Sequence, residues 1–472
     1  MSGEGIKENC GVFGVWNHPD AARLVYLGLY ALQHRGEESA GIVSTDGEKL
    51  FIHKGLGLVS DVFKTDEDLK PLVGRAAIGH VRYSTTGSTL LKNAQPLLFD
   101  YSHGKVAIGH NGNITNAKRL RDELEAYGAI FQTTTDSEII IHLMAKPSYR
   151  NRLEGLTQAL ERVEGAYTLV LLTESEMIGV RDPLGFRPLV LGRVGKSHVL
   201  ASETCALDLI EAEFVREIEP GEVVVINDKG IESRYPFGRS QEGPQAFCLF
   251  EHIYFSRPDS RVFGKTVLIV RERLGEELAR EHPVEADVVI PIPDSGNSAA
   301  LGFSRVSGIP VQDGVIRNHY VGRTFIQPSQ LVRDLKVKIK LNPVREVLEG
   351  RRVVVVDDSI VRGTTCKQRI QSLRKAGAKE IHMRVSCPPH KNPCYYGIDF
   401  PDRAQLLAAN KNLDEIRKFL DADSIGYLSI EGALRAAGHP PSKYCTACWT
   451  GKYPTTIREG VDKFSMEILR TL

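Results

Sequence analysis

RVVVVDDSIVRGTT, at residues 352–365, decides the fold of the second half of this chain. Its four consecutive valines predict a short strand buried on both faces, which is typical of a parallel sheet covered by helices. An apolar run, a small-residue loop and a helical pattern also follow one another in ADVVIPIPDSGNSAALGFSR, at residues 286–305. We therefore predict an α/β domain whose functional loops lie at the carboxyl ends of parallel strands.

The loop after the four valines carries groups suited to a phosphorylated ligand. Backbone N–H groups at the start of the next helix, with the hydroxyls in the range Ser359–Thr365, predict a cradle for a phosphate dianion. Gly363 permits close approach of the backbone. The carboxylates of Asp357 and Asp358 suit a ribose diol or a magnesium ion, which prefers oxygen ligands. The alternative interpretation is a plain strand and turn capped by aspartate.

The first half of the chain has a different pattern. From Cys10 to about Asp228, many short apolar or alternating runs are interleaved with few helical patterns, which indicates a layered α+β domain. Residues 235–247 then turn rich in proline, glycine and polar side chains, which is typical of a linker. Since 472 residues exceed what one core usually supports, we predict two domains, at residues 10–235 and 236–472.

Composition excludes several classes of function. The formal net charge is +1, so no global field favours nucleic acid or an anionic membrane. No apolar run reaches the roughly 18 residues needed to span a bilayer, and the first residues lack the apolar segment of a signal peptide. We expect a cytoplasmic protein with no nucleic-acid and no membrane partner.

Polar, glycine-bearing strings surround a cysteine near the start of the chain. Cys10 opens CGVFG, and an isolated cysteine is more often core packing than a nucleophile. Such polar strings are costly to bury unless their side chains are paired or used. They are LQHRGEESAGI at 32–42, IGHVRYSTTG at 78–87, GHNGNITN at 109–116 and TTDSE at 134–138.

The 352–365 string, with RNHYVGRTFIQP at 317–328, resembles the signature of type I phosphoribosyltransferases, which bind phosphoribosyl pyrophosphate (PRPP). This resemblance implies a magnesium ion at Asp357 and Asp358, with Ser295 of PDSGNSAA near the metal. It also implies a set of PRPP-binding residues. They are Asp357, Asp358, Ser359, Arg362, Gly363, Thr364 and Thr365.

The strings of the first half resemble the class II, N-terminal-nucleophile glutamine amidotransferases, whose domain has αββα layers. The resemblance implies Cys10 as nucleophile, Arg82 and Asp136 as the glutamine-binding pair, and an oxyanion hole formed by Asn111 and the Gly112 N–H. A thiol needs a base, and an α-amino group with a pKa of about 8 on the same residue is suitable. That amine is free only if the chain starts at Cys10, so we predict that residues 1–9 are a propeptide.

The remaining cysteines suggest a metal site. CTAC at 445–448 has ligand spacing, and Cys248 and Cys394 offer two more thiols. By spacing alone zinc, a [4Fe–4S] cluster and buried thiols compete, with zinc first. Resemblance reverses that order, because AFCLFEHIYFSRPDS, PCYYGID and YCTACWTGKYP match one branch of the family that holds a [4Fe–4S] cluster. It implies a set of four ligands, in which Cys387 is the alternative to Cys394. They are Cys248, Cys394, Cys445 and Cys448.

Two residues depart from that branch. Its members usually read EY and then FARPDS where this chain has EHIYFSRPDS, so His252 and Ser256 are departures. Neither change removes a thiol. Tyr254 lies in the same string just after the linker, and the resemblance implies that it couples the two sites.

Together the two resemblances imply an enzyme that hydrolyses glutamine and adds the ammonia to C1 of PRPP. The products would be glutamate, 5-phosphoribosylamine and pyrophosphate, in the first committed step of de novo purine (IMP) synthesis. A homotetramer inhibited by AMP or GMP is also implied. Two alternatives are another class II glutamine amidotransferase and a catalytically silent PRPP-sensing regulator. The PRPP string argues against the first, and the set Cys10, Arg82, Asn111 and Asp136 argues against the second.

Overall fold

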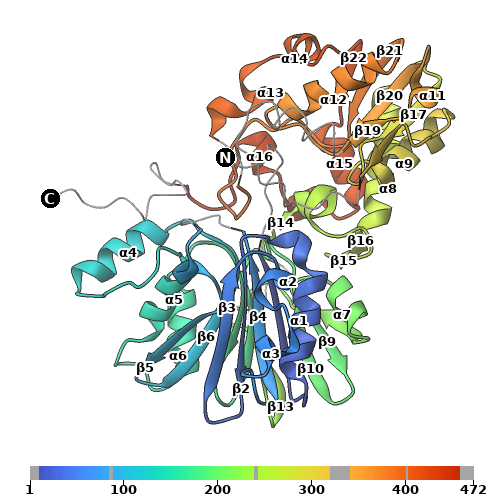
Figure 1. The fold of residues 1–472 in the computed structure, drawn as a ribbon. Coiled ribbons are helices and arrows are strands. Elements are labelled where there is room, and N and C mark those ends of the chain that lie inside the picture. Colours follow the sequence, from blue (N-terminus) through green and yellow to red (C-terminus); the bar gives the residue numbers. More distant parts are fainter. Residues whose placement is uncertain (1–9, 84–88, 239–242, 319–340, 400–401, 458–472) are drawn as a thin grey trace.

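The structure is a computed structural model that describes residues 10–83, 89–238, 243–318, 341–399 and 402–457. The predicted propeptide, residues 1–9, lies outside the described residues, as do residues 84–87 of the IGHVRYSTTG string and residues 319–328 of the RNHYVGRTFIQP string. Figure 1 shows two domains: strands and helices from β1 to β13 form one, and the yellow-to-red part of the chain forms the other. No helix among the described residues is both long and apolar enough to cross a membrane.

The first domain contains two antiparallel sheets packed face to face. A seven-stranded sheet has the order β11-β9-β10-β1-β4-β2-β3 and a six-stranded sheet the order β13-β12-β8-β7-β6-β5. The strands of the first sheet are β1 (Gly11–Trp16), β2 (Ser39–Thr45), β3 (Leu50–Leu56), β4 (Ala76–Arg82), β9 (Val190–Val194), β10 (Ser197–Ala201) and β11 (Glu213–Glu217). Those of the second are β5 (Leu97–Tyr101), β6 (Gly104–Ile114), β7 (Gly165–Leu172), β8 (Met177–Arg181), β12 (Val223–Asn227) and β13 (Gly230–Arg234).

Three apolar layers hold these sheets and their helices together. Val12, Ile78, Val170 and Leu200 belong to the layer between the two sheets and are completely buried. The outer face of the first sheet packs against α1 (Ala21–Ala31), α2 (Val59–Val62) and α7 (Cys205–Leu209), with α3 (Asp66–Leu69) and the turn η1 (Gln33–Arg35) nearby, and the turn η2 (Leu91–Asn93) contacts β3. The outer face of the second is covered by α4 (Ala117–Ala126), α5 (Ser137–Met144) and α6 (Arg152–Leu160). These αββα layers confirm the predicted α+β class.

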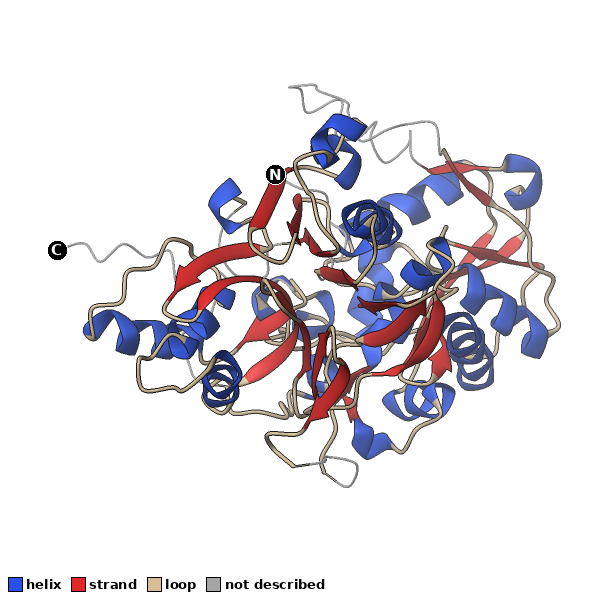
Figure 2. Ribbon diagram, turned by 90° about the horizontal axis from the view of Figure 1, so that it is seen from below, coloured by secondary structure: helices blue, strands red, loops and turns tan. Residues whose placement is uncertain are grey.

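The second domain is built on a parallel sheet with the order β17-β20-β21-β22. Its strands are β17 (Val288–Pro291), β20 (Arg352–Asp357), β21 (Glu380–Val385) and β22 (Ser424–Tyr427). The four valines of β20 are at most 1% exposed, as expected for a strand covered on both faces. Figure 2 shows the helices that surround these strands. They are α8 (Val267–Glu281), α9 (Asn297–Ser307), α11 (Arg345–Leu348), α12 (Thr364–Lys375), α13 (Leu407–Asn410), α14 (Leu413–Leu420) and α15 (Ile430–Ala437).

Short elements complete this domain and join it to the first. Two antiparallel pairs are β15 (Arg261–Val262) with β16 (Lys265–Thr266), and β18 (Val315–Arg317) with β19 (Leu341–Pro343). A parallel pair, β14 (Phe247–Cys248) with β23 (Tyr444–Cys445), sets Cys248 opposite Cys445. The remaining elements are the π-helix η3 (Glu251–Phe255), the turns η4 (Arg403–Gln405) and η5 (Pro441–Lys443), and α16 (Ala447–Thr450).

A buried network of charged side chains joins the two domains. The carboxylate of Glu251 in η3 accepts hydrogen bonds from Arg35 (2.8 and 3.0 Å) and from Arg187 (2.9 Å), and Arg35 also pairs with Glu203. All four side chains are 0% exposed. Although burial raises the pKa of Glu251, the two guanidinium groups outweigh it and lower that pKa to about 2. The network is therefore ionised at neutral pH and holds η3 against the first domain.

Replacing Glu251 with alanine is expected to lower the free energy of unfolding by about 3–5 kcal/mol, because two buried guanidinium groups lose their shared carboxylate. Urea unfolding followed by tryptophan fluorescence measures this. The matched control is Glu213→Ala, which breaks an exposed pair with Arg193 (2.7 Å) and should cost less than about 1 kcal/mol. Equal effects of the two substitutions would contradict the role given to the network.

Candidate active sites and thiol-lined cavity

Cys10 lies at the start of β1 and lines a small cavity between the two sheets. The cavity is lined by Cys10, Arg82, Tyr83, Gln95, His110, Gly112, Thr135 and Asp136. Cys10 is 6% exposed, and its thiol donates a hydrogen bond to the Tyr83 carbonyl (3.4 Å). Burial raises the pKa of the Cys10 thiol to about 11. The thiol is therefore protonated at neutral pH and needs a base before it can act as a nucleophile.

Arg82 and Asp136 bring opposite charges to the same cavity. Arg82, at the end of β4, is 3% exposed and lies 3.9 Å from Glu38. Asp136 precedes α5 and is 5% exposed. Burial raises the pKa of Asp136, but the facing His110 and the Ile114 N–H (2.9 Å) lower it below its ordinary value. A guanidinium and an ionised carboxylate around one cavity match the α-carboxylate and α-ammonium of an amino acid.

The predicted oxyanion residues lie on β6. Gly112 lines the cavity with φ +145°, and a β-carbon there would lie 2.1 Å from the Ala166 carbonyl oxygen, so only glycine fits. Asn111 is not among the lining residues. It is 0% exposed, and neither polar atom of its amide has a hydrogen-bond partner among the described residues. A buried amide donor without an acceptor is costly unless a ligand supplies one.

His110 was not among the predicted site residues, although the GHNGN string contains it. It lines the cavity, and its Nδ1 lies 3.1 Å from the Ser137 hydroxyl and 3.5 Å from the Asp136 carboxylate. The side chain of Gln95 accepts a hydrogen bond from the His110 N–H (2.8 Å). Gln95 stands before a proline in an ordinary loop, and no local pattern in the sequence marks it.

The predicted phosphate loop joins β20 to α12, at the carboxyl end of the parallel sheet. Asp357 and Asp358 are 3% and 5% exposed, and Asp357 pairs with Arg369 of α12 at 2.9 Å. Burial raises the pKa of Asp357, and the ion pair with Arg369 opposes this. The Ser359 hydroxyl donates to Asp358. Gly363 has φ +80° and precedes the helix, whose first residues, Thr364 and Thr365, are exposed and half-buried.

The loop that contains Ser295 follows β17, the strand next to β20. Ser295 is half-buried, and the Ile292 N–H donates to the Val356 carbonyl (2.8 Å), which ties this loop to the end of β20. A β-carbon at Gly296 would lie 2.4 Å from the same carbonyl oxygen. Both predicted PRPP loops therefore leave neighbouring parallel strands at one edge of the sheet, as predicted.

Besides the cysteines, the two remaining predicted site residues of this domain are Arg362 and Tyr254. Arg362 is half-buried and donates to the Gln405 side chain (3.0 Å). Tyr254, in η3, is half-buried, and its carbonyl accepts a hydrogen bond from Arg271 (2.8 Å). Arg271 is 5% exposed, and the nearby Asp358 carboxylate acts against the lowering of its pKa by burial. Tyr254 thus belongs to the element that carries Glu251 and contacts a residue that faces Asp358.

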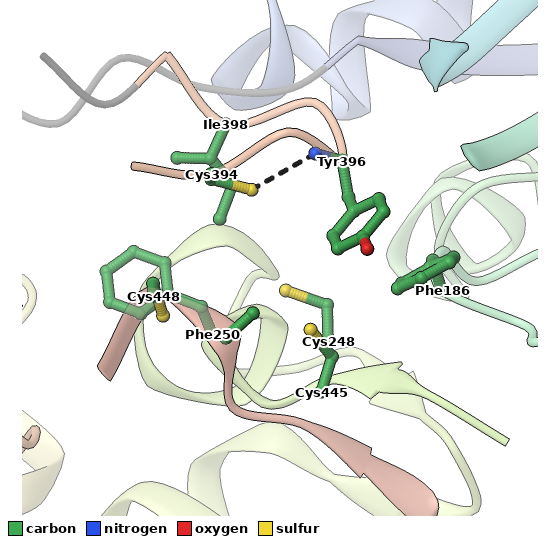
Figure 3. Close-up of a pocket in the computed structure, with 9 residues that line it drawn as sticks. Phe186, Cys248, Phe250, Cys394, Tyr396, Ile398, Cys445 and Cys448 are labelled. Atoms are coloured by element: carbon green, nitrogen blue, oxygen red, sulfur yellow. Dashed lines mark hydrogen bonds between the residues drawn. The ribbon is translucent and has the colours of Figure 1, made fainter. Parts of the chain in front are cut away.

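Four thiols line a second cavity between the domains. Figure 3 shows the sulfur atoms of Cys248, Cys394, Cys445 and Cys448 around one shared space, with Phe186, Phe250 and Tyr396 at its edge. The Cys394 sulfur accepts a hydrogen bond from the Tyr396 N–H (3.3 Å). The rival, Cys387, is not among the lining residues, and its sulfur lies 3.4 Å from His390 Nε2. Cys205 and Cys366 are buried elsewhere in the two cores.

The four thiols are the type of ligand that both zinc and iron–sulfur clusters take. Thiolates bound to one zinc ion at about 2.3 Å hold their sulfurs only about 4 Å apart. An apolar, thiol-lined cavity fits an iron–sulfur cluster, whose ligands are Cys thiolates.

Comparisons with known proteins agree with this geometry. A glutamine amidotransferase domain family matches residues 80–209, and a phosphoribosyl transferase domain family matches residues 263–405. A chloroplastic amidophosphoribosyltransferase of Glycine max is 52% identical over 96% of this chain and 79% of its own length. The amidophosphoribosyltransferase of Bacillus subtilis strain 168 is 48% identical over 96% of both chains.

A solved structure is also similar over the whole chain. It is described as glutamine PRPP amidotransferase from B. subtilis complexed with ADP and GMP. It is 47% identical with a TM-score of 0.91, and the match covers 96% of this chain and 99% of the other. The similarity runs through both domains, so it is not a likeness of one fold alone. This chain belongs to the amidophosphoribosyltransferase family.

Proposed function

We propose that this chain releases ammonia from the glutamine side chain at Cys10 and adds it to C1 of PRPP at the Asp357–Thr365 loop. Glutamine-dependent amination of PRPP is the reaction of the family and the first step of purine biosynthesis. The observation that carries the proposal is the cavity in which a buried thiol, guanidinium and carboxylate meet. The products are glutamate, 5-phosphoribosylamine and pyrophosphate.

In the first half-reaction, Arg82 holds the α-carboxylate of glutamine and Asp136 its α-ammonium. The Cys10 sulfur attacks the amide carbon, and the oxygen of that amide becomes an oxyanion. The Asn111 amide and the Gly112 N–H would stabilise it, and the unpartnered Asn111 donor supports this role. The carbon–nitrogen bond then breaks, ammonia leaves with the proton taken from the thiol, and water hydrolyses the thioester to glutamate.

The base in this step is the α-amino group of Cys10. Its role requires that residues 1–9 be removed as a propeptide. Because the pKa of the Cys10 thiol is raised, the base that takes its proton must lie next to the sulfur. The Arg35 side chain donates to the Cys10 carbonyl (3.1 Å), which fixes the backbone that carries both amine and thiol. No histidine is needed to take the proton.

In the second half-reaction, the loop from Ser359 to Thr365 holds the 5′-phosphate of PRPP, with Arg362 as a cation beside it. Asp357 and Asp358 hold the ribose hydroxyls. A magnesium ion at Asp357, Asp358 and Ser295 would neutralise the departing pyrophosphate, and it usually takes its other ligands from phosphate and water. Ammonia attacks C1 and pyrophosphate leaves. Tyr254 couples the sites through its contact with Arg271.

Further properties are proposed from resemblance and from the relatives. The four cavity thiols hold a structural [4Fe–4S] cluster, with zinc as the alternative. Since the B. subtilis relative was solved with ADP and GMP, we propose inhibition by purine nucleotides such as AMP and GMP, whose 5′-phosphate suits the PRPP loop. A homotetramer and a cytoplasmic location stay predictions.

The central test of the proposed function is Cys10→Ala. Loss of the nucleophile is expected to reduce glutamate release by more than about 1000-fold. Formation of 5-phosphoribosylamine from PRPP and added ammonia should persist, because the second site is untouched. Glutamate release by the unaltered enzyme is expected to rise when PRPP and magnesium are added. Release indifferent to PRPP would favour another glutamine amidotransferase, and no turnover of either substrate would favour a silent regulator.

Intact-mass analysis tests the propeptide. The active enzyme is expected to begin at Cys10 and to lack residues Met1–Asn9, because only then is the α-amine of Cys10 free. Acetylating that amine at mildly acidic pH should remove glutamate release and spare the ammonia-dependent reaction. Active enzyme that still carries residues 1–9 would contradict the amine-as-base mechanism.

Iron analysis of two cysteine variants tests the cluster. Cys394→Ser removes a cavity thiol and is expected to abolish bound iron and its visible absorbance, measured on anaerobically purified protein. Cys387→Ser, a change at a buried thiol that does not line the cavity, should keep about four iron atoms per chain. Loss of iron in both variants would contradict the assignment, and one zinc per chain would establish the alternative.

A further inference from the structure

The loop Cys394–Ile398, which carries one cavity thiol, also contacts the glutamine site. The backbone and side chains of this loop contact three residues of the first domain: Asn113, Arg187 and Phe186. Asn113, directly after the oxyanion residues, donates its side-chain N–H to the Tyr395 carbonyl (3.0 Å). Arg187 donates to the Tyr396 carbonyl (2.8 Å). The rings of Phe186 and Tyr396 are stacked, with centroids 4.2 Å apart and planes at 23°.

A further contact of this loop is between two glycines, Gly397 and Gly112. A β-carbon at Gly397 would lie 3.0 Å from the carbonyl carbon of Gly112 and 3.1 Å from its Cα and its oxygen. The contact is with backbone, which has no flexible end that can move aside. Gly397 also has φ +100°, so two independent features require glycine here. The backbone of the loop therefore lies directly on the backbone of the oxyanion residue.

We propose that the loop Cys394–Ile398 is a positioning element of the glutaminase site, in which Gly397 sets the place of Gly112. This inference rests on the proposed function of Gly112 as an oxyanion donor. The cluster proposed for the thiol-lined cavity would then have a further role: by binding Cys394, it would fix the loop that supports the oxyanion hole. Gly397 touches no substrate in this proposal and acts through Gly112 alone.

The proposal predicts which kinetic constant changes. An oxyanion donor interacts with the transition state more than with bound glutamine, so displacing it lowers kcat and leaves KM nearly constant. Alkylation of the Cys10 thiol by iodoacetamide forms no oxyanion and should keep its rate. Ammonia-dependent amination of PRPP bypasses the glutaminase site and should also be unchanged.

The test compares Gly397→Ala with Gly47→Ala. Gly47 has φ +99°, and a β-carbon there would meet nothing within 4 Å, so the two substitutions share the backbone strain and differ in the contact with Gly112. Gly397→Ala is expected to lower kcat for glutamate release by about 10- to 100-fold. Iron content, Cys10 alkylation and ammonia-dependent activity should stay within about twofold of the unaltered enzyme. Gly47→Ala should behave as the unaltered enzyme in all four measurements.

Equal kcat values for the two glycine variants would overturn the proposal, as would a change in KM alone. If Gly397→Ala loses iron, a second variant, Asn113→Ala, tests the proposal. The Asn113→Ala substitution removes the hydrogen bond to the Tyr395 carbonyl of the loop and leaves every thiol in place. It should then lower kcat in the same direction while keeping its iron, and an unchanged kcat would overturn the proposal. Failure of the proposed function is distinguishable, since Cys10→Ala would then continue to release glutamate.

Discussion

One carboxylate shared by two buried guanidinium groups connects the parts of this molecule that do chemistry. The Glu251 carboxylate accepts hydrogen bonds from Arg35 and Arg187. The Nε of Arg35 also donates to the Cys10 carbonyl, and the Nη2 of Arg187 donates to the Tyr396 carbonyl. The nucleophile and the cysteine-bearing loop are thus fixed by the same side chain. Since charges of both signs are buried together, neither domain can move away without leaving an unpaired ion in the interior.

One of the two departures from the family's usual string adds a hydrogen bond to the Glu251 network. Ser256, a departure from the usual FARPDS string, donates its hydroxyl to Glu251 (2.7 Å), a bond that an alanine cannot make. His252, the other departure, has no such explanation. It is 0% exposed, burial lowers its pKa to about 3, and neither ring nitrogen has a hydrogen-bond partner among the described residues. Its ring packs edge-on against Phe263 at 5.6 Å, so it acts here as a neutral aromatic group.

The sequence predicts those features whose physics is local. Four valines followed by two aspartates specify a buried parallel strand, which β20 confirms. They also predict that the loop from β20 to α12 binds a ligand, and this stays a prediction. The resemblance predicted that Cys10, Arg82, Gly112 and Asp136 lie together, because these residues come from segments that are far apart in the sequence. Two features were out of reach. The place of Gln95 in the cavity and the Gly397–Gly112 contact depend on how distant segments pack. In the sequence, a glycine required by such a contact cannot be distinguished from a glycine in an ordinary turn.

Burial raises the pKa of an acidic group at each of the two candidate sites. At Cys10, burial raises the pKa of the thiol, so the nucleophile is inert until a base and a substrate are present. At β20, burial raises the pKa of Asp357 next to a second carboxylate, so the pair is suited to receive positive charge from a metal ion. In the proposed function, each site is completed by its ligand. The cost of those unsatisfied groups must be offset elsewhere. The buried ion pairs around Glu251 contact both regions: Arg35 donates to the Cys10 carbonyl, and Glu251 belongs to η3, in which the Tyr254 carbonyl accepts from Arg271.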